Sequence, residues 1–262
     1  MSTLLHHHWC RRLIALVLIL CPVLMTEAMA LHLKDESHTS IKDYPFSVLI
    51  LGDSQMAGEG WEGGYANCIL EEYPNARILN LAQGGSVLAK GDLHAQWGLF
   101  LSEGFPMPDF ILLDGGINDL TYIHNEEFED AGFSLVKDAF CSLVEHIHET
   151  SPDTRIIYTL IPPLAEWKDS DNGPPAYEVQ ERCWKQMNIL ANGYDYITVL
   201  DLFSLNPFRY PCAECHRAYF IDSVHLSEAG YRKTFEYIDN ILLVRLAKKL
   251  EANKMTSPSE PD

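Results

Sequence analysis

Short apolar runs alternate with longer segments of helical periodicity along most of this chain. The short runs are rich in strand-forming residues and predict buried strands at 47–51, 76–81, 109–113, 155–160 and 196–201. The periodic segments predict helices at 64–73, 92–103, 127–150, 176–192 and 227–252. Alternation at this spacing is typical of a parallel sheet that carries helices on both faces and has right-handed crossovers.

The first 30 residues have the pattern of an export signal. Arg11 and Arg12 precede an apolar stretch at 13–25, and Ala28-Met29-Ala30 fits a small-residue cleavage site. The stretch is shorter than the about 20 apolar residues that a membrane span needs. We therefore expect a cleaved signal peptide over 1–30 and a secreted or periplasmic protein without stable membrane insertion. An uncleaved amino-terminal anchor is the alternative.

The rest of the chain is expected to form one domain with short segments on either side. Residues 31–43 are a polar lead-in, and 44–252 contain all the predicted strands and helices. Residues 253–262 are rich in Pro, Ser and acidic side chains, which predicts a disordered tail. About 200 residues are enough to bury one sizeable core. The sequence does not indicate an oligomeric state.

The chain is strongly acidic. Nineteen Lys and Arg residues stand against 37 Asp and Glu residues, giving a formal net charge of −18. Removal of Arg11, Arg12 and Glu27 with the signal would leave a net charge of −19. Binding to nucleic acids and anionic membrane surfaces depends on Lys and Arg, so we expect no nucleic-acid partner and favour neutral or cationic substrates.

Four short polar blocks carry the candidate chemistry: Gly52-Asp53-Ser54, Gly84-Gly85, Gly116-Ile117-Asn118-Asp119 and Asp222-Ser223-Val224-His225. The first places Ser54 just past the carboxyl end of a predicted strand, which is where open α/β sheets bind ligands. A serine hydroxyl needs a neighbouring base that is aligned by a third group. Asp222 and His225, three residues apart, can supply both.

This arrangement predicts acyl-ester chemistry. His225 would act as general base and then as general acid, while Asp222 would fix the imidazole tautomer. The side chain of Asn118 and the backbone N–H groups of Gly85 and Ser54 would stabilise the oxyanion. Asp53 is expected to organise the nucleophile turn. Asp119 is expected to cap the following segment or to hold Asn118, and Ser227 to cap the last helix.

Taken together, the blocks resemble the SGNH hydrolase family, also called GDSL esterases and lipases. The resemblance runs from about Val48 to Tyr231, and its second block is Asn80-Leu81-Ala82-Gln83-Gly84-Gly85-Ser86. Two positions depart from the family pattern: Gln55 replaces a common leucine, and Gly84 is a second candidate beside Gly85, although the spacing from Asn80 favours Gly85.

The resemblance implies a three-layer α/β/α sandwich of flavodoxin-like type with a parallel five-stranded sheet. It implies that Ser54, Asp222 and His225 form the triad and that Gly85 and Asn118 complete the oxyanion hole. No metal or organic cofactor is required.

These observations predict an exported serine esterase that acts on a small-molecule or glycan ester. Several aromatic residues near the blocks could stack on a sugar ring, which favours short acyl or O-acetyl groups on carbohydrate: Trp61, Tyr65, Trp97 and Trp167. The alternatives are a lysophospholipase, lipase or thioesterase of the same fold, a polysaccharide O-acyltransferase, and a catalytically dead carbohydrate-binding module.

A glycine pattern beside the nucleophile, Gly58-Glu59-Gly60-Trp61-Glu62-Gly63, matches the dinucleotide-binding consensus. The glycines begin about seven residues beyond the predicted strand rather than at its turn, and Glu59 and Glu62 would repel a pyrophosphate. We therefore do not predict nucleotide binding.

The cysteines allow more than one interpretation. Cys212-Ala213-Glu214-Cys215-His216 matches the pattern of c-type haem attachment, but a haem there would crowd the proposed active site, so a structural disulfide is favoured. Cys183, Cys212 and Cys215 compete for one bridge. Cys141 lies on an apolar helical face and is expected to be a buried thiol. Together with Cys68, five cysteines remain after signal removal, so at least one would be unpaired in a monomer. The sequence does not settle which cysteines pair.

Overall fold

The computed structural model describes residues 41–120, 129–164 and 176–256. The predicted signal peptide, most of the polar lead-in and Trp167 lie outside these residues. The chain divides into two compact units, one of Pro45–Ile238 and one of Met1–Tyr44 together with Asp239–Asp262. All the strands and all the predicted site residues belong to the unit Pro45–Ile238.

The sheet has five parallel strands in the order β2-β1-β3-β4-β5. Their bounds are Ser47–Leu51 for β1, Arg77–Asn80 for β2, Phe110–Leu113 for β3, Arg155–Leu160 for β4 and Ile197–Asp201 for β5. Every bound lies within about one residue of its prediction. The predicted five-stranded parallel sheet of a flavodoxin-like α/β/α fold is confirmed.

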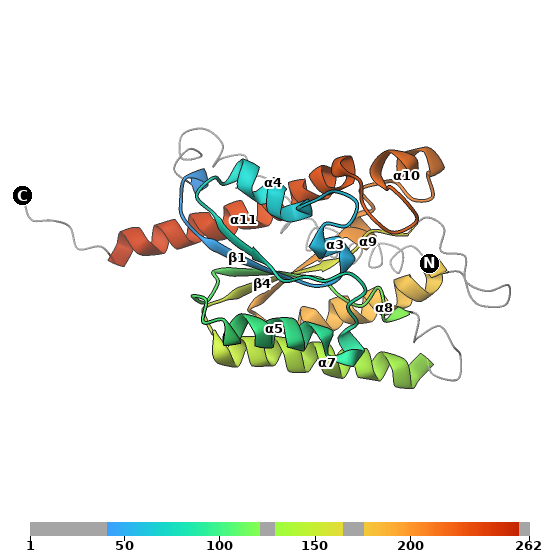
Figure 1. Cartoon of the computed structure of the whole chain (residues 1–262), viewed down its shortest axis with the longest axis horizontal. Helices are drawn as coiled ribbons and strands as arrows, with labels where there is room; N and C mark the ends of the chain where they lie inside the picture. Colours follow the sequence, from blue (N-terminus) through green and yellow to red (C-terminus); the bar gives the residue numbers. More distant parts are fainter. Residues whose placement is uncertain (1–40, 121–128, 165–175, 257–262) are drawn as a thin grey trace, which may run out of the picture. The chain divides into compact units, whose positions relative to one another are not determined.

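The helices of the unit Pro45–Ile238 cover both faces of the sheet, with α5, α7 and α8 on one side and α4 and the first turns of α11 on the other (Figure 1). Their bounds are Gly64–Glu72 for α4, Asp92–Ser102 for α5, Glu129–Thr150 for α7, Ala176–Ala191 for α8 and Glu228–Thr256 for α11. These are the five predicted helices. The last continues to Thr256, so the first four residues of the predicted disordered tail at 253–262 are helical, and 257–262 lie outside the described residues.

Short helical segments also occur that the sequence analysis did not predict: α3 (Ser54–Ala57), η1 (Leu88–Lys90), α9 (Leu202–Leu205) and α10 (Ala213–Tyr219). Each spans at most seven residues, too few for a hydrophobic period of 3.6 to be recognised. Three of them follow strands β1, β2 and β5, so they lie at the carboxyl edge of the sheet, where the candidate site is.

A cluster of buried side chains fills the space between the sheet and helices α5, α7 and α8. Leu51, Leu113 and Tyr158 contribute from the strands, and Trp97 and Phe140 from the helices. The indole of Trp97 is 1% exposed and stacks on Phe100. The expectation that it could stack on a sugar is therefore wrong, because α5 turns this face toward the sheet.

Candidate active site

The nucleophile turn is formed by the end of β1 and the start of α3. Ser54 is the first residue of α3 and is buried, and the carboxylate of Asp53 caps the helix by accepting a hydrogen bond from the N–H of Gln55 at 3.0 Å. Gly52 has a φ of +148°, and a Cβ there would lie 1.9 Å from Asp114 Oδ1. The turn therefore needs glycine at this position, and the predicted role of Asp53 is confirmed.

A buried carboxyl pair lies beneath this turn. Asp114 follows β3, and its Oδ1 accepts a hydrogen bond from the N–H of Asp53 at 2.9 Å. Burial raises the pKa of Asp53 to about 6 and holds the pKa of Asp114 well above its usual range. Two carboxyl groups this close and this deeply buried do not both ionise at low cost, so we expect them to share a proton. The sequence analysis did not predict Asp114, which only the fold brings to Asp53.

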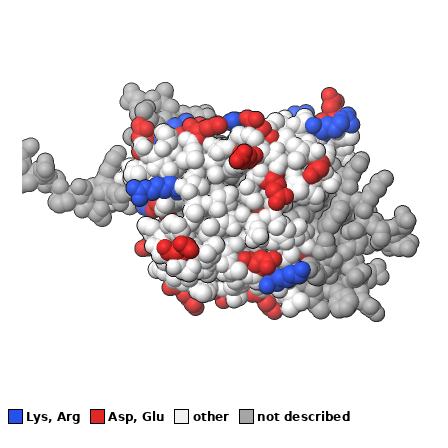
Figure 2. All heavy atoms as spheres, in the orientation of Figure 1, with Lys and Arg blue, Asp and Glu red and all other residues white. Residues whose placement is uncertain are grey.

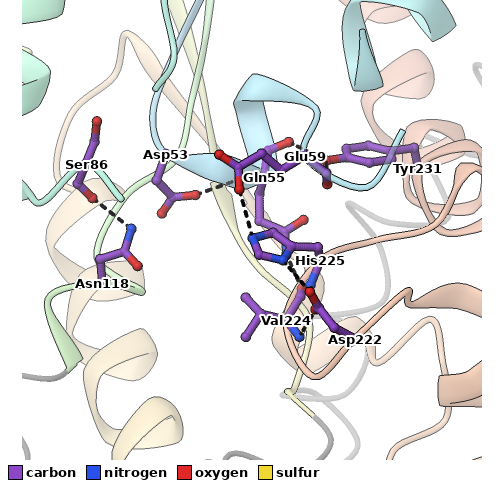
Figure 3. A network of polar contacts seen from close by, with 9 residues as sticks. All are labelled: Asp53, Gln55, Glu59, Ser86, Asn118, Asp222, Val224, His225 and Tyr231. Atoms are coloured by element: carbon purple, nitrogen blue, oxygen red, sulfur yellow. Dashed lines mark hydrogen bonds and ion pairs between the residues drawn. The ribbon is translucent and has the colours of Figure 1, made fainter. Parts of the chain in front are cut away.

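Gln96 of α5 joins the first and second blocks. Its Oε1 accepts from the N–H of Gly52 at 2.9 Å, and its Nε2 donates to the Gly52 carbonyl at 2.8 Å and to Ser86 Oγ at 3.0 Å. Asn118 Nδ2 donates to the Ser86 carbonyl at 3.0 Å (Figure 3). Gly85 has a φ of +77°, and no atom lies within 4 Å of its Cβ position. The fold thus brings Gly85 and Asn118 to neighbouring loops, with Ser86 between them.

Asp119 has a structural role that the sequence analysis did not predict. It is fully buried, and its two carboxylate oxygens accept hydrogen bonds from the N–H groups of Leu88 and Ala89 at 2.9 and 2.8 Å. Asp119 therefore anchors the start of η1, the segment that follows the second block. The segment that it was expected to cap begins at 121, outside the described residues, so that prediction stays a prediction. The sequence gives no sign of a contact with residues 30 positions earlier.

The fourth block forms a tight turn in which Asp222 holds His225. Asp222 Oδ1 accepts hydrogen bonds from the N–H groups of Val224 at 2.8 Å and His225 at 2.6 Å, and its Oδ2 lies 2.7 Å from His225 Nδ1 (Figure 3). Partial desolvation opposes ionisation, but the hydrogen bonds from His225 and Val224 hold the pKa of Asp222 below its usual range. Ser227 Oγ accepts from the Gly230 N–H at 3.3 Å, which confirms the predicted cap of α11.

Glu59 lies at the other nitrogen of the imidazole. Its Oε2 is 3.4 Å from His225 Nε2 (Figure 3). Among the described residues, Ser54 Oγ makes no hydrogen bond. The structure therefore forms the pair of Asp222 and His225 but not the bond from His225 to Ser54. In ligand-free enzymes such catalytic hydrogen bonds are often long and tighten only when substrate binds.

Two side chains tie the nucleophile turn to the turn of the fourth block. Gln55 Nε2 donates a hydrogen bond to the Val224 carbonyl. Tyr231 Oη donates to the Gln55 carbonyl at 2.8 Å and also lies 3.3 Å from the Glu59 carbonyl oxygen (Figure 3). Sequence reasoning missed these contacts and the position of Glu59. The one available signal was that Gln55 replaces a leucine of the family pattern.

Cys212 and Cys215 form a disulfide at the start of α10. Cys68 and Cys183 are buried thiols, and Cys141 is half-buried rather than buried as predicted. The competition among Cys183, Cys212 and Cys215 is thus resolved in favour of the short bridge. Within the described residues, no group of three or more His, Cys, Asp or Glu side chains could hold a metal ion.

A pocket of about 770 Å³ adjoins the fourth block. Its lining includes Asp222 and Ser223 of the block, together with the aromatic side chains of Phe208, Tyr210 and Phe220 and the guanidinium of Arg217. Phe208 and Phe220 are largely buried and pack against Tyr219, His216 and each other. The accessible part of the wall therefore consists of the half-buried Tyr210 and the polar side chains.

Two of the aromatic residues near the nucleophile have structural roles. Tyr65 is buried, its Oη hydrogen bonds with Thr234 Oγ1 at 2.9 Å and its ring packs edge-on against Tyr231. It cannot stack on a ligand, so that expectation is wrong. Trp61 is half-buried, and the guanidinium of Arg232 lies 5.0 Å from the centre of its ring.

Acidic side chains are dispersed over the face of the molecule in Figure 2, and the described residues form no continuous basic patch on that face. In the described part of the chain, no helix combines the length and the apolar character needed to cross a membrane.

The sequence and the fold of this chain are similar to those of known proteins. Residues 50–233 match the GDSL-like lipase/acylhydrolase family. A search of curated protein sequences finds no significant match. Among solved structures, an acetylxylan esterase from Geobacillus stearothermophilus is similar, with a TM-score of 0.57 and 21% identity over 76% of this chain and 95% of that chain. A variant of the same enzyme, there described as an acetyl-xylooligosaccharide esterase, has a TM-score of 0.54 and 23% identity over 76% of this chain and 95% of that chain. At these identities the two structures show a shared fold.

Proposed function

The chain belongs to the GDSL-like lipase/acylhydrolase family and is a carboxylic ester hydrolase, and we propose that it works through an acyl-enzyme with Ser54 as nucleophile. The observation that carries this proposal is the pair of His225 and Asp222, joined at 2.7 Å and tied to the nucleophile turn through Gln55. With Nδ1 bonded to Asp222, Nε2 is the nitrogen left to take a proton.

In the proposed mechanism, Ser54 Oγ attacks the ester carbonyl and its proton moves to His225 Nε2. The resulting oxyanion accepts hydrogen bonds from the N–H groups of Ser54 and Gly85 and from Asn118 Nδ2. The intermediate collapses to the acyl-enzyme, and the alcohol leaves with the proton from Nε2. Water then attacks the acyl group with His225 again as base, releasing the acid and Ser54. Each oxyanion donor would contribute about 3–4 kcal/mol of transition-state stabilisation.

The proposed substrates are short acyl or O-acetyl esters of carbohydrates. The pocket beside Asp222, with Tyr210 and polar side chains in its wall, supports this choice, as does the acidic surface, which disfavours anionic lipid surfaces. The similar Geobacillus enzyme, described both as an acetylxylan esterase and as an acetyl-xylooligosaccharide esterase, agrees with it. Lysophospholipase, lipase or thioesterase activity is the nearest alternative. A polysaccharide O-acyltransferase would pass the acyl group to a sugar hydroxyl instead of water.

We further propose that the protein is exported by its amino-terminal signal, that 31–43 is a polar lead-in and that 44–252 is the catalytic domain. The basic, apolar and small-residue pattern of residues 1–30 supports export. Determining the amino-terminal residue of the exported protein tests it, with cleavage after Ala30 as the expected result.

The first experiment compares the purified protein with its Ser54→Ala variant on p-nitrophenyl acetate, butyrate and palmitate at neutral pH. We expect turnover that requires Ser54 and is fastest with acetate. Preference for palmitate would favour the lipase alternative. If added xylo-oligosaccharide consumed the acyl group without release of free acid, the protein would be a transferase. Glycan binding without turnover by the folded protein would indicate a dead binding module.

A further inference from the structure

Glu59 occupies the mouth of the proposed site. One carboxylate oxygen, Oε2, lies 3.4 Å from His225 Nε2 (Figure 3). The other, Oε1, lies against Gly84, because a Cβ built on that glycine would be 1.8 Å from it. The carboxylate therefore stands between the imidazole and the glycine block that carries the proposed oxyanion donor.

The backbone of Glu59 is held on both sides. Its N–H donates to the Ser54 carbonyl at 3.0 Å, and its own carbonyl lies 3.3 Å from Tyr231 Oη. The next residue, Gly60, has a φ of +105°, and a Cβ there would lie 2.3 Å from the Leu226 carbonyl oxygen. This part of the chain is thus packed against the turn that carries His225, and the backbone of Glu59 is fixed beside the proposed site.

The charge of Glu59 is poorly compensated. Among the described residues, His225 is the only basic side chain within 4.0 Å of its carboxylate, and the Glu59 side chain is 52% exposed. Asp222 adds a second carboxylate on the far side of the same imidazole. A group bound beside Nε2 therefore meets a negative charge that no Lys or Arg in the described residues neutralises at contact distance.

We propose that Glu59 determines specificity for the alcohol part of the ester; this inference rests on the proposed function. The departing alcohol oxygen must lie at Nε2, since it leaves with the proton from that nitrogen, and it must therefore lie beside the Glu59 carboxylate. A carboxylate accepts hydrogen bonds from hydroxyl groups near the ester and repels carboxylate or phosphate groups there. The substrate class is thus esters of uncharged polyhydroxylated alcohols, and esters of acidic sugars and phosphate-bearing alcohols are poor substrates.

The test uses two acetate esters that differ in charge on the alcohol part, 4-(hydroxymethyl)phenyl acetate and 4-carboxyphenyl acetate. The quantity measured is kcat/KM for the anionic ester divided by kcat/KM for the neutral ester, so that intrinsic differences between the esters cancel when variants are compared. Glu59→Gln should raise this ratio on the order of tenfold, as expected for removing a like charge within several ångströms in a partly hydrated site. Glu59→Lys should raise it further.

Glu62→Gln is the matched control. Glu62 is exposed and lies three residues after Glu59, so the substitution removes the same charge outside the proposed site. If only the charge at the site matters, the ratio should stay unchanged within about twofold. An unchanged ratio in Glu59→Gln and Glu59→Lys, or an equal rise in Glu62→Gln, overturns the role of Glu59 while hydrolysis still requires Ser54. If Ser54→Ala hydrolyses both esters as fast as the wild type, the proposed function fails as well.

Discussion

The two halves of the proposed site are constructed differently. The nucleophile turn is buried and is held from several elements at once, by Gln96 of α5, by Asp114 after β3 and by its own cap at Asp53. The turn of the fourth block is half-buried, with Asp222 exposed, and is held mainly from within, by the hydrogen bonds that Asp222 accepts from Val224 and His225.

This difference indicates where the proposed site is vulnerable. The core fixes Ser54, whereas the position of His225 depends on local hydrogen bonds and a few contacts that cross to the nucleophile turn. Loss of a contact beneath Ser54 should therefore change mainly stability. Loss of a contact around His225 should change mainly turnover.

The largest expected effect comes from Asp222→Asn. The substitution keeps the size of the side chain but removes the charge that orients His225 and stabilises its protonated form. We expect kcat to fall by a factor on the order of 10⁴, with melting changed by a few degrees at most, because the residue is exposed. Ester hydrolysis and thermal unfolding measure the two effects. A loss of less than about tenfold would mean that His225 does not act through Asp222.

Asp114→Asn should change how stability depends on pH. Burial raises the folded-state pKa of Asp53 to about 6 and raises that of Asp114 well above its usual range, so the folded protein binds these protons more tightly than the unfolded chain. The contribution of these two protonated carboxyl groups to the free energy of unfolding is complete below the unfolded pKa of about 4. It is lost as the pH rises through 6 and beyond.

The amide can still accept from the N–H of Asp53 and no longer ionises. We therefore expect the variant to lose less stability than the wild type between pH 4 and pH 8, by on the order of 1–3 kcal/mol. Denaturant unfolding at a series of pH values measures the free energy of unfolding. Parallel pH profiles for the two proteins would contradict the shared-proton interpretation.

Gln55→Leu should affect turnover more than stability. It removes the donor to the Val224 carbonyl while keeping a side chain of similar size, so the turn that carries His225 loses an anchor. We expect kcat to fall about tenfold and the free energy of unfolding to fall by about 1–2 kcal/mol.

The matched control is Thr154→Val at the opposite end of the sheet, where Thr154 Oγ1 donates to the buried Pro108 carbonyl at 2.6 Å. It should lose similar stability and keep its kcat within about twofold. Equal losses of kcat in the two variants would mean that Gln55 matters only for stability.

The smallest effect is expected from replacing both Cys212 and Cys215 with serine. The bridge closes a short loop, with a sequence separation of three, so it restricts the unfolded chain only slightly. We expect a loss of at most about 2 kcal/mol of stability and less than a threefold change in kcat/KM. Comparison of melting temperature and ester hydrolysis with and without reductant checks this. A large loss of activity would show that α10 positions the fourth block.

Much of the fold could be predicted because its signals are local. Each strand is a short, continuous apolar run, as in the Ser47–Leu51 segment, where four of five residues are buried. The α3, η1, α9 and α10 segments are too short to show a period, and the packing direction of α5 could not be read from its composition. For that reason Trp97 was assigned to a ligand platform although it lies in the core.

The chemistry-bearing blocks could also be recognised, since their residues are contiguous in sequence. What sequence reasoning could not find are side chains that act across long distances in the chain: Gln96 on the Gly52 backbone, Asp114 under Asp53, and Glu59 beside His225. No pattern in the sequence marks these side chains as partners, and each contact exists only once the parallel sheet has aligned its strand ends. The roles of Ser54, Asp222, His225, Gly85 and Asn118 stay predictions.

The hydroxyl of Tyr231 has a consequence for the order of events during synthesis. Its bond to the Gln55 carbonyl joins residues 176 positions apart, so the nucleophile turn receives this support only after all five strands have been synthesised. Contacts of such long sequence separation form late in folding. A chain still emerging from the ribosome would carry its serine from the start but would have no working esterase until its last helix had begun to form.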